Sequence, residues 1–185
     1  MEGMIYGRPS AGFTMTELIV TMSIAAILLA IAIPSFRYVT VSNRISTEVN
    51  GLLGDLQYAR SLAVKQGLPV TVCVSADGAT CAGASTWQSG WIVFLDSNSN
   101  QQVDPNEAIM RVQPAFSSTD TFVPAGAAAL SAITFNREGY ASTGNVTPVT
   151  LELHDLTSNQ AWTRCMEISP VGMLTTMKYN GGNCQ

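Results

Sequence analysis

Glu17 is a single carboxylate placed directly before an uncharged, mostly apolar stretch, Leu18 to Ile33, with the sequence LIVTMSIAAILLAIAI. A charge inside a membrane-length segment costs about 2.5–3.5 kcal/mol on insertion scales. Such a residue is retained only where a positive group neutralises it. We therefore predict that Glu17 forms an ion pair with a partner group, in addition to the favourable interaction of a carboxylate with a helix N-terminus.

Oxygen-bearing side chains also follow one another between residues 96 and 107. They stand at loop positions 1, 3, 5, 7, 9 and 12: Asp96, Asn98, Asn100, Gln102, Asp104 and Glu107. This spacing is that of the calcium loop D-x-[DN]-x-[DN]-G-x5-E, except that Gln101 replaces the glycine of the sharp turn. With three carboxylates we expect weak calcium binding. The alternative is a polar turn whose Asn and Asp side chains bond the backbone.

The four cysteines are Cys73, Cys81, Cys165 and Cys184. An even number in an oxidising compartment predicts two disulfides, with three possible connectivities. We favour Cys73–Cys81, closing a hairpin, and Cys165–Cys184, joining the C-terminal tail to the last long strand. A zinc site of four thiolates is the alternative, but no C-x-x-C spacing supports it.

Enzymatic chemistry finds no support in the sequence. The one histidine, His154, lies on a strand-like segment, and the motifs G-x-S-x-G, H-E-x-x-H and a phosphate-binding loop are missing. We predict no catalytic residue. The net charge of −4 argues against binding to nucleic acid, because no net basic field attracts phosphates.

The segment that positions Glu17 is long enough to cross a membrane. Residues 13–33 would span a hydrocarbon core of about 30 Å as a helix. A removable signal peptide is the simpler alternative, but the preceding segment has only Arg8 against Glu2, and no small-x-small cleavage site follows. We predict a retained helix over 13–34, with a kink or local melting at Pro34.

The helical pattern continues beyond Pro34. Apolar residues recur with helical period at Ile45, Val49, Leu52, Leu56, Ala59 and Ala63. Gly67 and Pro69 then stop the helix. We therefore expect an amphipathic helix over 35–66 that packs under a sheet.

Residues 67–185 change to short runs rich in β-branched and aromatic residues, separated by turn clusters. The predicted strands are Val70–Ser75, Gly90–Leu95, Ile109–Val112, Ala132–Phe135, Val149–Leu153 and Trp162–Ile168. The predicted fold is α+β: a long N-terminal helical spine packed on an antiparallel β-sheet head of about six or seven strands.

The N-terminus resembles the leader of type IV pilins and pseudopilins, in Gly12-Phe-Thr-Met-Thr-Glu17 followed by an apolar helix with Pro34. The resemblance implies a leader over 1–12, cut after Gly12 by a prepilin peptidase that N-methylates Phe13. It also implies that Glu17 pairs with the α-amine of Phe13, on a neighbouring subunit or on its own chain.

Two further stretches resemble the GspH/FimT/FimU group of minor pilins and pseudopilins. They are Leu52 to Val70, containing Ala-Arg-Ser, and Trp87 to Asp96, containing Gly-Trp-Ile-Val-Phe. The resemblance implies an inner-membrane protein with one span and a periplasmic head, which later enters a pilus or pseudopilus. Its implied partners are other minor pilins and the major pilin.

Three functions follow from this resemblance. The first is a minor pilin that initiates type IV pilus assembly in a tip complex, which the resemblance of the Cys165–Cys184 loop to pilin tails favours. The second is an H-type minor pseudopilin of type II secretion. The third is a FimT-like DNA receptor, disfavoured because Gly172-Met-Leu-Thr175 lacks the two arginines of that motif and only Lys178 is near.

Overall fold

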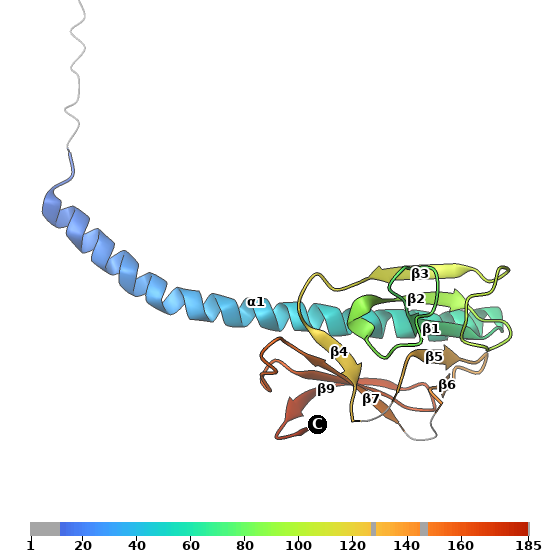
Figure 1. Cartoon of the computed structure of the whole chain (residues 1–185). Helices are drawn as coiled ribbons and strands as arrows, with labels where there is room; N and C mark the ends of the chain where they lie inside the picture. Colours follow the sequence, from blue (N-terminus) through green and yellow to red (C-terminus); the bar gives the residue numbers. More distant parts are fainter. Residues whose placement is uncertain (1–11, 127–128, 145–147, 185) are drawn as a thin grey trace, which may run out of the picture. The chain divides into compact units, whose positions relative to one another are not determined.

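The computed structural model describes residues 12–126, 129–144 and 148–184. Of the predicted leader, only Gly12 lies among them. The chain divides into two units, residues 1–40 and residues 41–185, and the boundary falls within one helix. The first unit is predominantly the N-terminal part of this helix. The second, which we call the head unit, contains the remainder of the helix and all the strands described (Figure 1).

Helix α1 runs over Met15–Gln66, close to the predicted 13–66, and Pro34 lies inside it. Its end follows the turn signal in the sequence. Gly67 takes a left-handed conformation, with φ +69°. The Gly67 N–H donates to the carbonyl of Ala63 at 2.9 Å, which satisfies one of the last free carbonyls of the helix.

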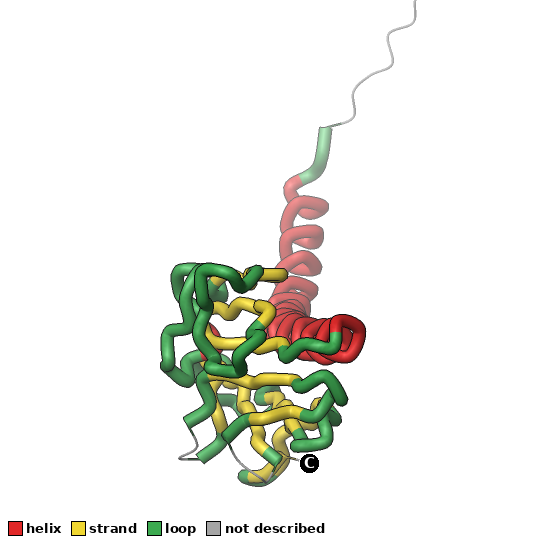
Figure 2. The backbone as a smooth tube through the Cα atoms, turned by 90° about the vertical axis from the view of Figure 1, so that its right-hand side faces the viewer, coloured by secondary structure: helices red, strands yellow, loops and turns green. Residues whose placement is uncertain are grey.

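The antiparallel sheet head is confirmed, but its described residues form two five-stranded sheets, which is more than the six or seven strands predicted. The first has the order β3-β2-β1-β5-β6, with β1 Val70–Val74, β2 Gly90–Leu95, β3 Ile109–Pro114, β5 Ala132–Phe135 and β6 Ala141–Ser142. The second has the order β10-β9-β8-β7-β4, with β4 Thr121–Pro124, β7 Val149–His154, β8 Arg164–Ile168, β9 Leu174–Asn180 and β10 Asn183–Cys184. A short 3-10 helix, η1 Trp87–Ser89, leads into β2. The tube view separates the two groups of strands (Figure 2).

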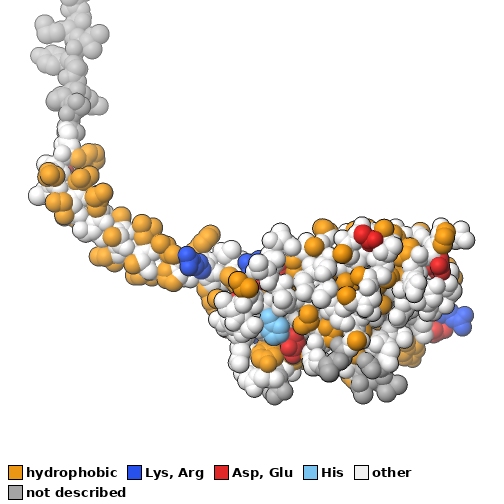
Figure 3. Space-filling view, viewed as in Figure 1, with side chains coloured by type: hydrophobic (Ala, Val, Ile, Leu, Met, Phe, Trp, Pro, Cys, Tyr) orange, Lys and Arg blue, Asp and Glu red, His pale blue; other side chains and the backbone are white. Residues whose placement is uncertain are grey.

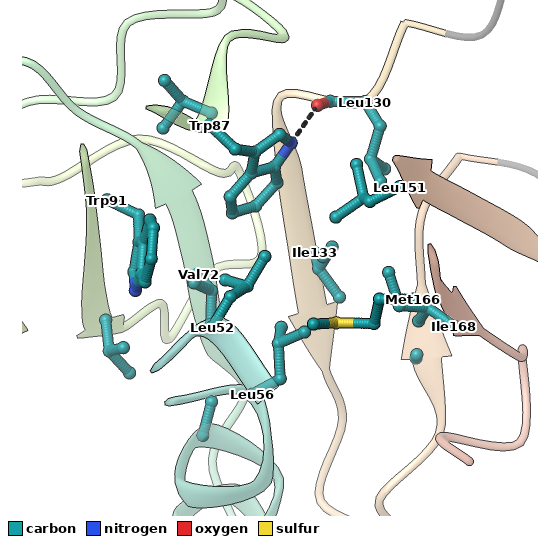
Figure 4. Packing of buried hydrophobic residues seen from close by; sticks show 14 of the residues in the cluster. Leu52, Leu56, Val72, Trp87, Trp91, Leu130, Ile133, Leu151, Met166 and Ile168 are labelled. Carbon is teal, nitrogen blue, oxygen red and sulfur yellow. Dashed lines mark hydrogen bonds between the residues drawn. The ribbon is translucent and has the colours of Figure 1, made fainter. Parts of the chain in front are cut away.

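The core of the head unit forms where the apolar stripe of α1 meets both sheets. Leu52 and Leu56 of the helix are fully buried, together with Val72 and Ile133 of the first sheet and Met166 of the second. Figure 4 shows these side chains converging, with the Trp87 indole N–H donating to the carbonyl of Leu130 at 2.9 Å. Apolar burial of this kind contributes about 25 cal/mol for each Å² removed from water, so it dominates the stability of the head.

The strands β1, β2 and β5 of the first sheet are buried on both faces, whereas β3 at its edge is mostly exposed. Every residue of β1 is buried, although only alternate residues belong to the core on the helix side. On the other face, Cys73, Ile92 and Phe94 form a second apolar cluster, with Cys81 and Val103 packed against it. The chain segments around residues 81 and 103 therefore cover the outer face of this sheet.

Candidate assembly site

The first turn of α1 holds Glu17 in a capping box. Thr14 Oγ1 accepts from the Glu17 N–H at 3.2 Å, and Glu17 Oε2 accepts from the Thr14 N–H at 3.0 Å. Thr14 Oγ1 also donates to Glu17 Oε2 at 3.0 Å. This is the reciprocal arrangement that S/T-x-x-E sequences favour at helix starts. Pairing of Glu17 with the amine of Phe13 stays a prediction, and an incoming amine would compete with these bonds.

The apolar part of the helix that follows Glu17 exposes its side chains. Every described residue up to Thr40 is exposed, including bulky ones such as Leu18, Ile27 and Phe36. Figure 3 shows apolar side chains along this part of α1, ahead of the first Lys or Arg side chains. By length and composition this helix could cross a membrane, a test that a signal sequence near the N-terminus also passes. An apolar surface of this extent requires lipid or protein to cover it.

Pro34 does not interrupt the helix. Residues on both sides of it keep α-helical backbone, so the local melting considered from the sequence is not what the structure has. Proline still removes one backbone hydrogen bond at this point. The predicted kink stays a prediction.

The four cysteines form two disulfides. Cys73 pairs with Cys81 and Cys165 with Cys184, the connectivity favoured from the sequence. The first fastens the segment after β1 onto the outer face of the first sheet. The second joins β8 to β10 at the C-terminus. With all four sulfurs in disulfides, the alternative of a zinc site built from four thiolates is excluded for this state.

The side-chain oxygen atoms of the loop 96–107 accept hydrogen bonds mainly from N–H groups of the same loop. Asp96 is buried, and its carboxylate accepts from the N–H groups of Asn100 and Gln101 at 3.0 Å each. Thr71 Oγ1 donates to the same carboxylate at 2.6 Å. Gln101, where the calcium pattern has glycine, adopts a φ of +61°. This position is therefore left-handed even without glycine, at a cost in strain.

The other candidate ligands of this loop also have partners within it. Asp104 Oδ2 accepts from the side-chain amides of Asn98 and Asn100 at 2.8 and 3.0 Å. The carboxylate of Glu107 accepts from the N–H groups of Ser97 and Asp104 at 2.8 and 3.1 Å. Asn100 Oδ1 accepts from the Gln102 N–H at 2.8 Å. These bonds are those of the polar turn, and calcium binding, which would have to displace several of them, stays a prediction.

Charged residues off the apolar stripe of α1 attach the helix to the head, a role that their spacing did not reveal. Arg44 binds the buried carboxylate of Asp120 through two nitrogens, at 2.6 and 2.8 Å. Asp55 accepts from the indole N–H of Trp91 and from Arg111, both at 2.8 Å. Opposite charge is the only sequence signal for the two ion pairs, and the neutral Trp91 gives none; the partners lie 36 to 76 residues apart.

Arg60, within the Ala-Arg-Ser stretch, connects the helix to two glycine turns. Its Nε donates to the carbonyl of Gly139 at 3.0 Å, and its Nη2 donates to that of Val171 at 3.4 Å. Gly172, the residue matched to the DNA-receptor motif, lies in one of these turns and has a φ of +75°. A Cβ at Gly172 would lie 2.1 Å from the Gly139 carbonyl oxygen. The turn at Gly172 is thus accounted for by packing.

The side chain of His154 is part-buried. Its Nε2 lies 3.1 Å from Glu152 Oε2, and its Nδ1 lies 3.2 Å from Thr163 Oγ1. Its ring also meets that of Tyr179 edge-on. These contacts join β7, β9 and the turn before β8 on the outer face of the second sheet, so the histidine has a structural explanation.

The type II transport protein GspH family model matches residues 48–172, more than half of the chain. This chain belongs to the GspH family. The prokaryotic N-terminal methylation motif matches residues 7–33, which include Gly12, Phe13 and Glu17. Membership of the GspH family places the protein among the minor pilins and pseudopilins of type IV pili or type II secretion, which are structural proteins and not enzymes. The methylation motif implies processing by a prepilin peptidase and assembly with other pilins.

Solved structures of a type IV minor pilin and of a minor pseudopilin share the fold of this chain. The type IV minor pilin FimU of Pseudomonas aeruginosa PAO1, in a P21 crystal, has a TM-score of 0.57 and 20% identity over 77% of this chain and 93% of its own. The same protein in a P65 crystal has a TM-score of 0.55 and 22% identity, over 72% of this chain and 93% of its own. The minor pseudopilin EpsH of the Vibrio cholerae type 2 secretion system has a TM-score of 0.50 and 10% identity, over 73% of this chain and 97% of its own. No curated protein matches.

Proposed function

We propose that this chain is a minor pilin that helps to initiate type IV pilus assembly, as part of a complex at the tip. The observation that carries the proposal is the part of α1 that runs from Glu17 to Thr40, where a single carboxylate precedes apolar side chains that are all exposed. In the inner membrane, lipid would cover this surface. In a filament, the corresponding helices of neighbouring subunits would cover it, with the head unit in the periplasm and then on the filament.

Glu17 would fix the axial alignment of neighbouring helices in the filament. Inside a filament its carboxylate would exchange its bonds to Thr14 for a charge pair with the methylated amine of Phe13 on a neighbouring subunit. A buried pair of this kind adds little net stability, but a mismatch leaves a buried charge without a partner and costs about 3–5 kcal/mol. Subunits would therefore be held at the one axial position where the pair can form.

The C-terminal disulfide supports the pilus over the secretion system. Cys165–Cys184 fastens the last strand to the second sheet, as in the disulfide-bounded tails that the sequence resembles. The alternative is an H-type minor pseudopilin of type II secretion. The description of the matching family favours this alternative, so both activities have to be measured together.

The test is deletion of the gene, followed by counting of sheared surface fibres and assay of secreted enzymes in the same cultures. We expect fibres to be lost and secretion to persist. The wild-type gene should restore the fibres, whereas a Gly12→Val variant, blocked in processing, should not. Intact fibres with failed secretion would instead identify a pseudopilin. If both persist, the assembly role is wrong, and binding of DNA by the purified protein at low salt becomes the next measurement.

A further inference from the structure

A groove of about 530 Å³ lies on the head unit beside the first turns of its helix. One wall is formed by Arg44, Thr47, Glu48 and Gly51 of α1, and the other by Trp91 and residues 113–117. We call it the Glu48 groove. All of its lining belongs to the head unit, so its geometry is that of one compact body.

Glu48 is an acid without a counter-ion in this groove. Its Oε1 accepts from Ser118 Oγ at 2.8 Å, but its Oε2 is shut off from solvent and has no hydrogen-bond partner among the described residues. The nearby cation, Arg44, is engaged with Asp120 through both nitrogens. Burial raises the pKa of Glu48 from 4.5 to about 7, and Asp120 adds to this rise through its negative charge and as a hydrogen-bond acceptor for the protonated acid. The carboxyl group therefore needs either a proton or a cation.

The rest of the groove suits a long, apolar stem. Trp91 is held by its bond to Asp55 and meets Phe116 edge-on, with ring centroids 6.0 Å apart. Pro114 and Ala115 add exposed apolar surface beside them. Lys and Arg place aliphatic stems along such surfaces and their charges beside aromatic faces or carboxylates.

Gly51 adds an independent observation. It stands in the middle of a helix, where glycine costs about 1 kcal/mol relative to alanine. A Cβ at Gly51 would have no atom of this chain within 4 Å, so packing within the head does not require glycine there. Gly54, one turn away, is in the same situation but does not line the groove. The lack of a side chain at position 51 leaves this part of the groove open.

We propose that the Glu48 groove receives a lysine or arginine side chain of a neighbouring pilin subunit, whose charged end pairs with Glu48. The inference rests on the proposed function, because it needs a filament or tip complex to supply the neighbour. The cation takes the place of the proton on Glu48 and neutralises the carboxylate. The groove thus becomes a contact between heads, separate from the packing of the apolar helices.

This exchange makes the contact depend on pH. The charged groups facing Glu48 are Arg44 from the helix and Asp120 from the segment before β4, and Asp155 acts on Arg44. Because binding of the cation displaces a proton from Glu48, the association constant should rise by up to tenfold per pH unit below about pH 7 and level off above it.

The experiment introduces the photo-crosslinking residue p-benzoylphenylalanine into the full-length chain at Thr47, which is exposed and lines the groove. Asn50, exposed on the same helix but outside the lining, is the matched position. Sheared filaments are irradiated, and the crosslinked peptide is identified by mass spectrometry. We expect Thr47, but not Asn50, to capture a peptide of another pilin that contains lysine or arginine. The association constant of that purified pilin with the full-length chain in detergent is then measured from pH 5.5 to 8.

Two pairs of variants sharpen this experiment. Glu48→Gln should reduce the crosslink at least fivefold and abolish the pH dependence, whereas Glu138→Gln, which removes an exposed charge elsewhere, should change neither. Gly51→Leu should obstruct the groove and reduce the crosslink, whereas Gly54→Leu should leave it unchanged. Both leucine variants should fold, because each replaces a helix glycine that has open space around it.

Several results would overturn the proposal. One is a captured peptide without lysine or arginine, and another is a crosslink that Glu48→Gln leaves intact. A third is the lack of any crosslink from Thr47 in filaments that contain the chain. If the wild-type chain is missing from filaments altogether, the proposed function fails and this inference fails with it. That result is distinguished from the others by an immunoblot of the sheared fraction.

Discussion

At the scale of single residues, Glu17 serves two purposes that substitution can separate. Its carboxylate caps the helix through Thr14, and we propose that it also pairs with an amine of a neighbour. Glutamine can take the glutamate's place in a capping box but carries no charge. We therefore expect Glu17→Gln and Glu17→Ala to lower incorporation into sheared filaments alike, by about tenfold or more, at equal membrane levels. Incorporation of Glu17→Gln at the wild-type level would show that only the cap matters.

Glu48 makes a second prediction, about stability. Its pKa in the folded chain is about 7, above the ordinary 4.5, so the folded state holds the proton more tightly than the unfolded state. This contribution to stability is fully present below pH 4.5 and is lost as the pH rises through 7. After allowance for partial solvent screening, we expect a loss of about 1–2 kcal/mol.

The measurement is thermal unfolding of the full-length chain in detergent, followed by the fluorescence of the buried Trp87 and Trp91 between pH 5 and 8. Glu48→Gln stays neutral throughout, so its unfolding temperature should fall less over this range than that of the wild type. Glu138→Gln serves as the control and should keep the wild-type slope. Equal slopes for Glu48→Gln and the wild type would refute the assignment.

The loop 96–107 makes a third prediction at this scale. Calcium would have to exchange with the internal bonds that Asp96 and Asp104 already accept. Weak extracellular calcium modules bind at about 10⁻⁴–10⁻³ M, and we expect this loop to lie at the weak end. Calorimetric titration of the full-length chain measures this directly, with Asp104→Asn as the control that should weaken binding. An absence of heat at millimolar calcium rejects the site.

At the scale of elements, the close approach of two turns under Arg60 depends on Gly172. Gly172 and Gly67 both have positive φ, so a Cβ costs about 1 kcal/mol in backbone strain at either position. Only at Gly172 would the Cβ also collide, 2.1 Å from the carbonyl oxygen of Gly139. We expect Gly172→Ala to lower the free energy of unfolding by about 3 kcal/mol or more, and Gly67→Ala by about 1 kcal/mol. Equal losses in denaturant titrations would contradict this packing.

Elements with a strong local pattern were predictable from the sequence. Strands β2 and β5 occur at the predicted residues, because dense β-branched and aromatic runs are bounded there by turn residues. Strand β9 was missed because its mixed sequence, Leu174–Asn180, leaves most of its residues exposed or half-buried. Strands β6 and β10 have two residues each, too few for any periodicity. The division into two sheets depends on pairings between distant strands, which local pattern does not encode.

The candidate site was likewise predictable where its residues lie close together in the sequence, and not where their partners are distant. Gly12, Phe13 and Glu17 are contiguous in sequence, so their spacing alone predicted the assembly motif. The cysteine pairing that the sequence favoured among three possible connectivities is the one formed, with partners 8 and 19 residues apart. Glu48 could not be found in this way. Its significance depends on Ser118, 70 residues away, and on the engagement of Arg44 by Asp120.

At the scale of the whole molecule, the order of the C-terminus depends on one disulfide. Strand β10 pairs with β9 over two residues only, so the Cys165–Cys184 disulfide is its main attachment to the second sheet. Chain-entropy estimates give about 3 kcal/mol for a separation of 19 residues and about 2.5 kcal/mol for the 8 residues between Cys73 and Cys81. The two disulfides thus stabilise the head to a similar degree but hold different regions.

This similarity allows stability and assembly to be measured separately. We expect the double serine variants at Cys165/Cys184 and at Cys73/Cys81 to lower the unfolding temperature by comparable amounts, about 10 °C each. If an ordered C-terminus is needed for docking, only the Cys165/Cys184 variant should also reduce the number of sheared fibres, at a growth temperature where both variants are folded. Equal fibre numbers for the two variants would mean that the disulfides act through stability alone. The C-terminal disulfide would then no longer favour a pilus over a secretion pseudopilus.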